Sequence, residues 1–170
     1  MLFMLVKKRL QGKKMKIEKS NRKDAKDLTD LTIRSKSHWN YGEKQIEEWR
    51  KELTITENYI DQNQVYKLLI DNLLIGFYAY QPENKMDIKL NYLFVEPKYI
   101  GKGYGKVLMS DFLQRIENSK FERVILDADP NAENFYSKLG FRVIGKLKSS
   151  IKERFLPIME LKIKPVANKK

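Results

Sequence analysis

The sequence predicts an α/β fold in which about four helices flank a central, twisted mixed sheet. Three observations lead to this prediction. Segments with helical spacing of apolar residues alternate with short apolar strands along the chain. A glycine-rich stretch, 101–105, joins an apolar run to a helical pattern. The chain has 170 residues, 42% of them apolar and 33% charged, which suits one soluble globular domain with a buried core.

The N-terminal part of this domain is expected to hold a strand and two amphipathic helices. Residues 16–20 form the first strand. Residues 24–39 place small and apolar side chains on one helical face, and Asn21 or Asp24 caps this helix. Residues 43–53 show the same spacing and form the second helix.

Three strands are predicted next. Residues 65–70 and 73–81 are apolar runs on either side of Asp71 and Asn72, a pair that suits a two-residue hairpin turn. Residues 86–95 alternate apolar and polar side chains, as a strand with one buried face does.

The remainder supplies a third helix, a strand, a fourth helix and two final strands. The fourth helix ends at Gly140, because glycine readily takes the left-handed conformation that follows a helix. In order, these elements occupy residues 107–116, 123–129, 131–140, 141–150 and 156–163.

Composition excludes several kinds of site. The chain has no cysteine, so it forms no disulfide and offers no thiolate nucleophile or metal ligand. A single histidine, His38, argues against a zinc site. We therefore expect no metal, and the composition suits the cytoplasm.

The net charge of +12 comes mainly from the two ends of the chain. Residues 1–14 hold five Lys or Arg and residues 162–170 hold four Lys, with no acidic residue in either segment. The rest carries 25 basic and 22 acidic residues, a net charge of +3. Because no aromatic-plus-basic motif accompanies this charge, we expect no specific nucleic-acid partner.

The expected domain covers residues 15–163, between a basic N-terminal extension at 1–14 and a basic tail at 164–170. The extension is interpreted as non-native or disordered, with a short extra strand or arm as the alternative. Its first six residues are apolar, far fewer than the ~20 that span a membrane, so no membrane partner is expected.

The glycine-rich stretch indicates a phosphate site. The first N–H groups of a helix lack internal partners and carry partial positive charge, to which Lys102 and Lys106 add. The spacing G-x-G-x-G fails both the dinucleotide fingerprint and the P-loop. A tight strand-to-helix connection without a ligand is the alternative.

Two motifs together resemble the GNAT superfamily of N-acetyltransferases. Gly103 and Gly105 match its glycine motif for the diphosphate of coenzyme A. The stretch DADPNAENFYSKLGF matches its second motif at Ala132, Tyr136, Gly140 and Phe141. The resemblance covers about residues 15–163, and it implies the GNAT acyl-CoA N-acyltransferase fold with acetyl-CoA as cosubstrate.

Two departures from the family pattern bear on the cofactor site. Ile100 stands where Gln or Arg is usual, so a side-chain contact to phosphate is lost. Asp129 stands where Asn is usual, and we assign it a capping role before Pro130. The cofactor residues that the resemblance implies are Phe94, Val95, Ile100, Gly101, Lys102, Gly103, Tyr104, Gly105, Lys106, Asn131, Phe135 and Tyr136.

The resemblance also implies catalytic roles. The Val95 N–H would donate to the acetyl oxygen, and Tyr136 would protonate the departing sulfur, with a core aromatic as the alternative for Tyr136. His38 is a candidate base, because its reference pKa suits proton abstraction, although a rim residue is the commoner outcome. Glu96, Asp87 and an ordered water chain are weaker alternatives.

The acceptor site is predicted from three residues. Trp39 and Tyr41 would line an aromatic pocket, although core packing explains the tryptophans nearly as well. Arg154 would pair with an acceptor carboxylate, or else be a solvated loop charge.

The resulting hypothesis is an acetyl-CoA-dependent N-acetyltransferase that acts on a small-molecule or protein amine. A noncatalytic acyl-CoA-binding regulatory module and a basic nucleic-acid binder are the alternatives. The acceptor, the base and a homodimer stay open.

Overall fold

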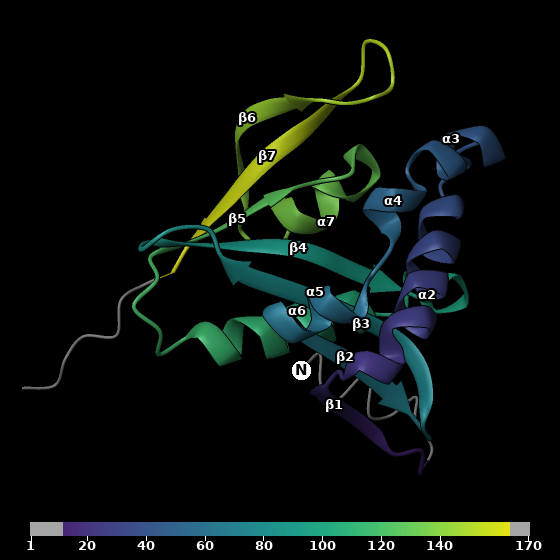
Figure 1. The fold of residues 1–170 in the computed structure, drawn as a ribbon. Coiled ribbons are helices and arrows are strands. Elements are labelled where there is room, and N and C mark those ends of the chain that lie inside the picture. The colour runs from purple at the N-terminus through teal and green to yellow at the C-terminus, as the bar shows by residue number, and fades with distance from the viewer. Residues whose placement is uncertain (1–11, 164–170) are drawn as a thin grey trace, which may run out of the picture. The chain divides into compact units, whose positions relative to one another are not determined.

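The structure, a computed structural model, describes residues 12–163 and is drawn in Figure 1. Most of the predicted extension and the predicted tail, 1–11 and 164–170, lie outside the described residues. The described strands are β1 (Met15–Lys19), β2 (Gln64–Ile70), β3 (Leu73–Pro82), β4 (Asp87–Val95), β5 (Arg123–Asp127), β6 (Arg142–Lys148) and β7 (Phe155–Lys162).

The strands form one mixed sheet in the order β1-β2-β3-β4-β5-β7-β6. β4 pairs in parallel with β5, whereas β1 with β2, β5 with β7, and β6 with β7 pair antiparallel. The predicted mixed sheet is therefore confirmed.

The helices follow the predicted order, with one division and one addition. The expected second helix is divided at Trp49, although the Leu53 N–H still donates to the Trp49 carbonyl at 2.9 Å. The added helix begins after Thr56, whose hydroxyl accepts from the Tyr59 N–H. The α-helices are α2 (Ala25–Ser37), α3 (Glu43–Glu48), α4 (Arg50–Leu53), α5 (Glu57–Gln62), α6 (Tyr104–Ile116) and α7 (Glu133–Ser137), and the 3-10 helices are η1 (Arg22–Asp24), η2 (Pro97–Tyr99) and η3 (Pro130–Ala132).

The chain divides into two compact units. Among the described residues, the first consists of 12–79 and 92–114, and the second of 80–91 and 115–163. β3, β4 and α6 contribute residues to both units. The glycine loop and Val95 belong to the first unit, and Tyr136 belongs to the second.

In the first unit, β3 is covered on both faces because successive side chains of a strand point to opposite sides. Phe77 lies in a core cluster with Leu28 and Leu31 of α2. On the other face, the Tyr78 ring contacts the Phe112 ring of α6, with centroids 5.7 Å apart. α2 and α6 thus cover opposite faces of β3.

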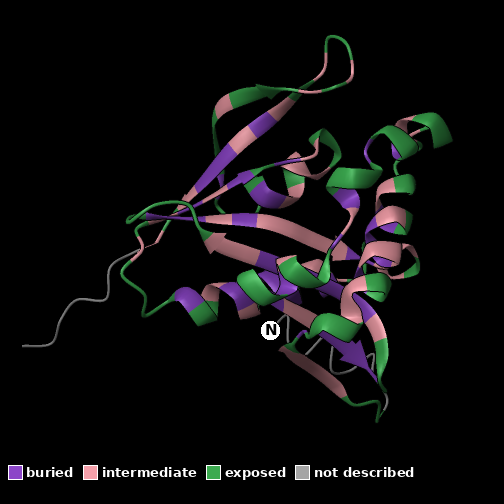
Figure 2. Ribbon diagram, in the orientation of Figure 1, coloured by how far each residue is buried: buried purple, intermediate pink, exposed green. Residues whose placement is uncertain are grey.

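In the second unit, β6 and β7 form a long hairpin (Figure 1). Figure 2 shows that β6 is exposed along nearly its whole length, as an edge strand is. The buried ring of Tyr136 in α7 packs against Phe141, which lies just before β6.

Candidate active site

The glycine loop lies between η2 and α6, at the end of β4. Gly101 and Gly103 have φ angles of 77° and 93°, which non-glycine residues rarely adopt. A Cβ atom at Gly101 would meet nothing within 4 Å, so the loop is open there. α6 begins directly afterwards, at Tyr104. The first amides of a 13-residue helix therefore follow an exposed, tightly turned loop, as a phosphate site requires.

Two lysines place positive charge beside this loop. The Lys98 and Lys102 ammonium groups lie 5.1 Å and 5.5 Å from the centroid of the Tyr99 ring. Tyr99 in turn meets the buried Tyr104 ring edge-on, at 5.5 Å. Cation–π attraction to an anchored ring limits the freedom of both ammonium groups. Lys106 is exposed on α6, and Ile100 is half-buried.

The main chain at the end of β4 has a defined direction. A Cβ atom built on Gly76 of β3 would lie 2.6 Å from the Phe94 carbonyl oxygen. The peptide bond between Phe94 and Val95 is trans, so its N–H points opposite to its carbonyl. The Val95 N–H therefore points away from β3. The Phe94 side chain belongs to the aromatic core, with its ring 6.1 Å from the Phe77 ring.

Tyr136 is a buried phenol. Its side chain contacts the rings of Phe135 and Phe141, with centroids 5.1 Å and 5.6 Å away. Within residues 12–163, no group forms a hydrogen bond with its hydroxyl. Burial raises the pKa of the Tyr136 phenol well above its usual value of 10, and the Asp129 carboxylate adds to the rise. The group therefore stays protonated at neutral pH.

Asp129 caps η3 as predicted. Its carboxylate accepts from the Asn131 N–H at 2.9 Å, and Pro130 follows at the first helical position. The Asn131 side-chain amide donates to the same oxygen, also at 2.9 Å. Arg154 lies 3.3 Å from that oxygen and is only 17% exposed. The interpretation of Arg154 as a solvated loop charge is therefore wrong.

The aromatic candidates for the acceptor site differ in exposure. His38 and Trp39 are exposed just after α2, with their rings edge-on at 5.1 Å. Tyr41 packs edge-on against the buried Trp49, and the Lys36 ammonium lies about 5 Å from both rings. Trp49 is thus a core residue, whereas Trp39 is free to meet a ligand.

The two carboxylates considered as alternative bases are both engaged. The Glu96 carboxylate accepts hydrogen bonds from two nitrogens of Arg34. Asp87 is held by Arg123 and Asn84, and the Arg123 hydrogen bonds are the main reason that the pKa of Asp87 falls below its usual value of 3.8. Each of the two carboxylates is thus held by an arginine.

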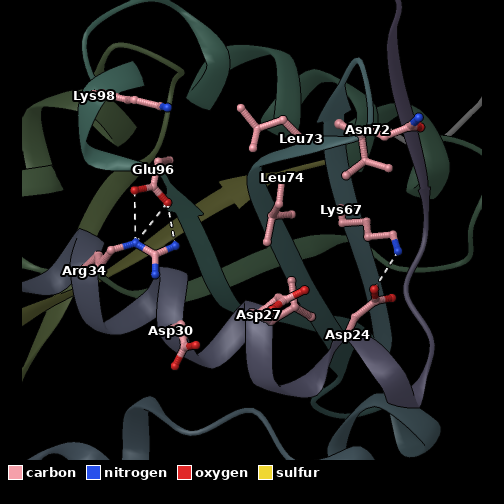
Figure 3. A pocket seen from close by; sticks show the side chains of 12 residues that line it. Asp24, Asp27, Asp30, Arg34, Lys67, Asn72, Leu73, Leu74, Glu96 and Lys98 are labelled. Carbon is pink, nitrogen blue, oxygen red and sulfur yellow. Dashed lines mark hydrogen bonds and ion pairs between the residues drawn. The ribbon is translucent and has the colours of Figure 1, made fainter.

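The first unit also contains a pocket of about 490 Å³, shown in Figure 3. It lies beside α2 and the β2–β3 turn. Glu96 and Lys98, from the segment that joins Val95 to the glycine loop, contribute to its lining. None of the cofactor residues predicted from the sequence lines it. The other lining residues are Asp24, Asp27, Leu28, Asp30, Arg34, Lys67, Leu69, Asn72, Leu73 and Leu74.

Residues 12–163 offer neither a metal site nor a membrane span. They contain no group of three or more His, Cys, Asp or Glu side chains placed to hold a metal ion. No helix in the same range is both long and apolar enough to cross a bilayer.

Sequence reasoning did not find Gly76 or the Arg34–Glu96 pair. Gly76 carried a readable signal, since a glycine inside an apolar strand often marks a close approach of another backbone. The Arg34–Glu96 pair carried none, because 62 residues separate its members.

Comparisons with known proteins place this geometry in a family context. The model of the acetyltransferase (GNAT) domain family matches residues 25–163. An uncharacterized N-acetyltransferase ycf52 of Gracilaria tenuistipitata var. liui is 26% identical over 89 residues, which are 52% of this chain and 49% of that protein. The chain thus spans about half the length of that relative.

Two solved structures share the fold. PaiA N-acetyltransferase of Thermoplasma acidophilum, in complex with coenzyme A, has a TM-score of 0.72 and 22% identity, over 88% of this chain and 99% of that one. The ribosomal-protein-S18-alanine N-acetyltransferase of Escherichia coli has a TM-score of 0.69 and 16% identity, over 92% and 99%.

Proposed function

The chain belongs to the GNAT acetyltransferase family, and from this premise we propose that it transfers an acetyl group from acetyl-CoA to a primary amine of a small molecule or protein. The glycine loop carries the proposal. Its two left-handed glycines expose main-chain amides at the start of α6, beside the Lys102 ammonium group. This donor set suits the diphosphate of coenzyme A.

The residues present fit the cosubstrate, and each has a proposed task. Acetyl-CoA, when bound, supplies the acetyl group as a thioester. The α6 amides and Lys102 bind the diphosphate. The Val95 N–H donates to the acetyl oxygen, and the protonated Tyr136 hydroxyl gives its proton to the sulfur. The other proposed contacts are Phe94, Ile100, Gly101, Gly103, Tyr104, Gly105, Lys106, Asn131 and Phe135.

The buried phenol supports the proton-donor role of Tyr136. Its raised pKa keeps the hydroxyl protonated at neutral pH, which is the form that a proton donor must have.

The acceptor side is a separate part of the proposal. His38 is proposed as the base, and Trp39 and Tyr41 as acceptor contacts. Arg154 is proposed as a partner for an acceptor carboxylate, which would have to share it with Asp129. A cytoplasmic location and a homodimer remain predictions from the sequence.

The test combines acetyl-CoA calorimetry with thiol release across amines, amino acids, polyamines and peptides. We expect acetyl-CoA to bind and at least one amine to accelerate thiol release. No heat of acetyl-CoA binding would contradict the proposal. Tight binding without turnover on any amine would favour the noncatalytic acyl-CoA-binding module.

A further inference from the structure

Three contacts within the first unit hold the end of β4 and Glu96, the residue that follows it. The Glu96 N–H donates to the Ile75 carbonyl of β3 at 2.8 Å. Gly76 lies directly against the Phe94 carbonyl. Arg34 of α2 grips the Glu96 carboxylate. All three contacts fall within two residues of the Val95 N–H, so they restrict the position of this amide.

Gly76 controls the peptide unit that contains this N–H. A Cβ atom at residue 76 would lie 2.6 Å from the Phe94 oxygen, 3.3 Å from the Val95 Cα and 3.0 Å from Leu108 Cδ1. The first two contacts are with backbone atoms, and Leu108 is fully buried. Neither the β4 backbone nor the Leu108 side chain can therefore move aside easily to make room for a Cβ atom. Because the peptide is planar, any displacement of the Phe94 oxygen also moves the Val95 N–H.

Arg34 fixes the next residue. Its Nε lies 3.0 Å from Glu96 Oε1 and its Nη2 lies 2.8 Å from Oε2. The dashed lines in Figure 3 mark these hydrogen bonds. A two-pronged guanidinium–carboxylate pair sets orientation as well as distance. The Arg34 side chain is 52% exposed and the Glu96 side chain 17%, so the pair is only partly exposed to solvent. Whatever the pair adds to stability, its geometry fixes the orientation of the Glu96 side chain.

We propose that Gly76 and Arg34 are positioning residues that hold the Val95 N–H where it donates to the acetyl oxygen. This inference rests on the proposed function. A donor of this kind works only at about 2.7–3.1 Å from the oxygen that gains charge, so small displacements matter. Neither residue touches the reacting atoms, since Arg34 acts through Glu96 and Gly76 acts through Phe94.

The test compares binding and turnover in matched variants. Gly76→Ala displaces the peptide, and Arg34→Gln releases Glu96. Gly145→Ala is the glycine control, because a Cβ there meets only the Ile158 side chain at 3.5 Å. Lys26→Gln is the ion-pair control, because it breaks the Lys26–Asp30 pair of the same helix. The double variant Arg34→Glu with Glu96→Arg restores the pair with reversed charges.

Two quantities separate positioning from a structural role. One is the ratio of the dissociation constants of CoA and acetyl-CoA, since only acetyl-CoA carries the oxygen that Val95 would contact. The other is kcat with the best amine of the panel. We expect Gly76→Ala to lower kcat about 100-fold and Arg34→Gln about 10-fold, with CoA affinity changed less than about threefold. The ratio should move toward one, and charge reversal should restore both quantities.

Unchanged kcat and ratio in Arg34→Gln would overturn the inference while leaving the proposed function intact. The inference is also overturned if charge reversal fails to rescue a deficient single variant. If Gly76→Ala does not fold, the Arg34→Gln variant and the charge-reversed double variant still test whether the Val95 N–H is held in position. If wild-type protein binds no acetyl-CoA, the proposed function itself fails, and this inference fails with it.

Discussion

Tyr136 shows how the surroundings of one side chain fix its chemistry. A phenol in water gives up its proton near pH 10, but burial against Phe135 and Phe141 disfavours the charged form. The group can therefore donate a proton over the whole physiological pH range. Deprotonation of Tyr136 should not appear as a loss of activity at moderately alkaline pH.

We predict that Tyr136→Phe lowers kcat about 100-fold, as loss of a general acid does, and leaves CoA affinity within about twofold. The hydroxyl is lost but the ring packing is kept. Assays of thiol release from pH 6 to pH 9.5 measure the effect. Tyr59→Phe, which removes the hydroxyl of a half-buried tyrosine in the first unit, is the control. An alkaline loss of activity that Tyr136→Phe abolishes would show that the phenol titrates after all.

Residues whose roles depend on distant partners could not be predicted. The left-handed glycines and the Asp129 cap were readable because their causes lie within a few positions. The Arg154–Asp129 and Arg34–Glu96 pairs were not readable, since only the folded chain brings their members together. The glycine loop and the cap of η3 could therefore be predicted from the local sequence, whereas the two ion pairs require the tertiary structure.

At the scale of elements, the β2–β3 hairpin was predictable from its two turn residues. Asp71 and Asn72 have φ angles of 49° and 65°, a conformation that follows the right-handed twist of the flanking strands. Asp71 also ties the turn to the residue before β1, because its carboxylate accepts from the Lys14 N–H at 2.9 Å.

We predict that Asn72→Ala lowers the free energy of unfolding by about 1 kcal/mol, because alanine tolerates left-handed dihedrals poorly. Asn72→Gly should leave it unchanged or raise it. Urea titrations followed by circular dichroism measure both. Asn58→Ala, on the exposed face of α5, is the control and should cost nothing. Equal stabilities of the Ala and Gly variants would show that backbone strain at residue 72 is unimportant.

The three short helices that directly follow α2, namely α3, α4 and α5, were harder to predict. The division at Trp49 leaves the apolar spacing intact, so the sequence pattern cannot reveal it. α5 has six residues and a single buried side chain, Ile60, which is too little for a periodic signal. Short helices held by tertiary packing therefore escape pattern reasoning.

An ion network joins β4, β5 and β7 within the second unit. Arg123 of β5 donates to both oxygens of the buried Asp87 at 2.8 Å and lies 3.3 Å from Glu160. Because the pKa of Asp87 is lowered in the folded state, the charged carboxylate stabilises the fold above the unfolded value of 3.8. That contribution is lost as the pH falls through the lower, folded value.

We predict that Asp87→Asn lowers the melting temperature by several degrees at pH 7, and that its difference from wild type shrinks below about pH 4. Differential scanning calorimetry from pH 7 to pH 3 measures the trend. Asp30→Asn removes an exposed carboxylate and serves as the control. A difference that is constant across this range would contradict the assignment of the acid-sensitive stability to Asp87.

At the scale of the whole molecule, charge is distributed unevenly along the chain. Residues 1–11 and 164–170 together hold six Lys or Arg and no acidic residue. Residues 12–163 hold 28 basic and 22 acidic residues, a net charge of +6. Many of the basic side chains in this range are paired with carboxylates, as Arg34, Lys67, Lys89 and Arg123 are. The two terminal segments thus carry as much net charge as the far longer range 12–163, so the net charge per residue is highest there.

We predict that affinity for a ~20-base-pair DNA duplex of arbitrary sequence depends on these six cations. Each phosphate contact contributes about −0.9 to the slope of log affinity against log salt, so removal of residues 1–11 and 164–170 should flatten the slope by up to about five. Fluorescence anisotropy between 20 and 200 mM salt measures it. A full-length variant with the same six residues changed to Gln separates charge from length and should match the truncated protein. A truncated protein that keeps both affinity and slope would place a nucleic-acid surface within residues 12–163, and would revive the nucleic-acid binder as a competing function.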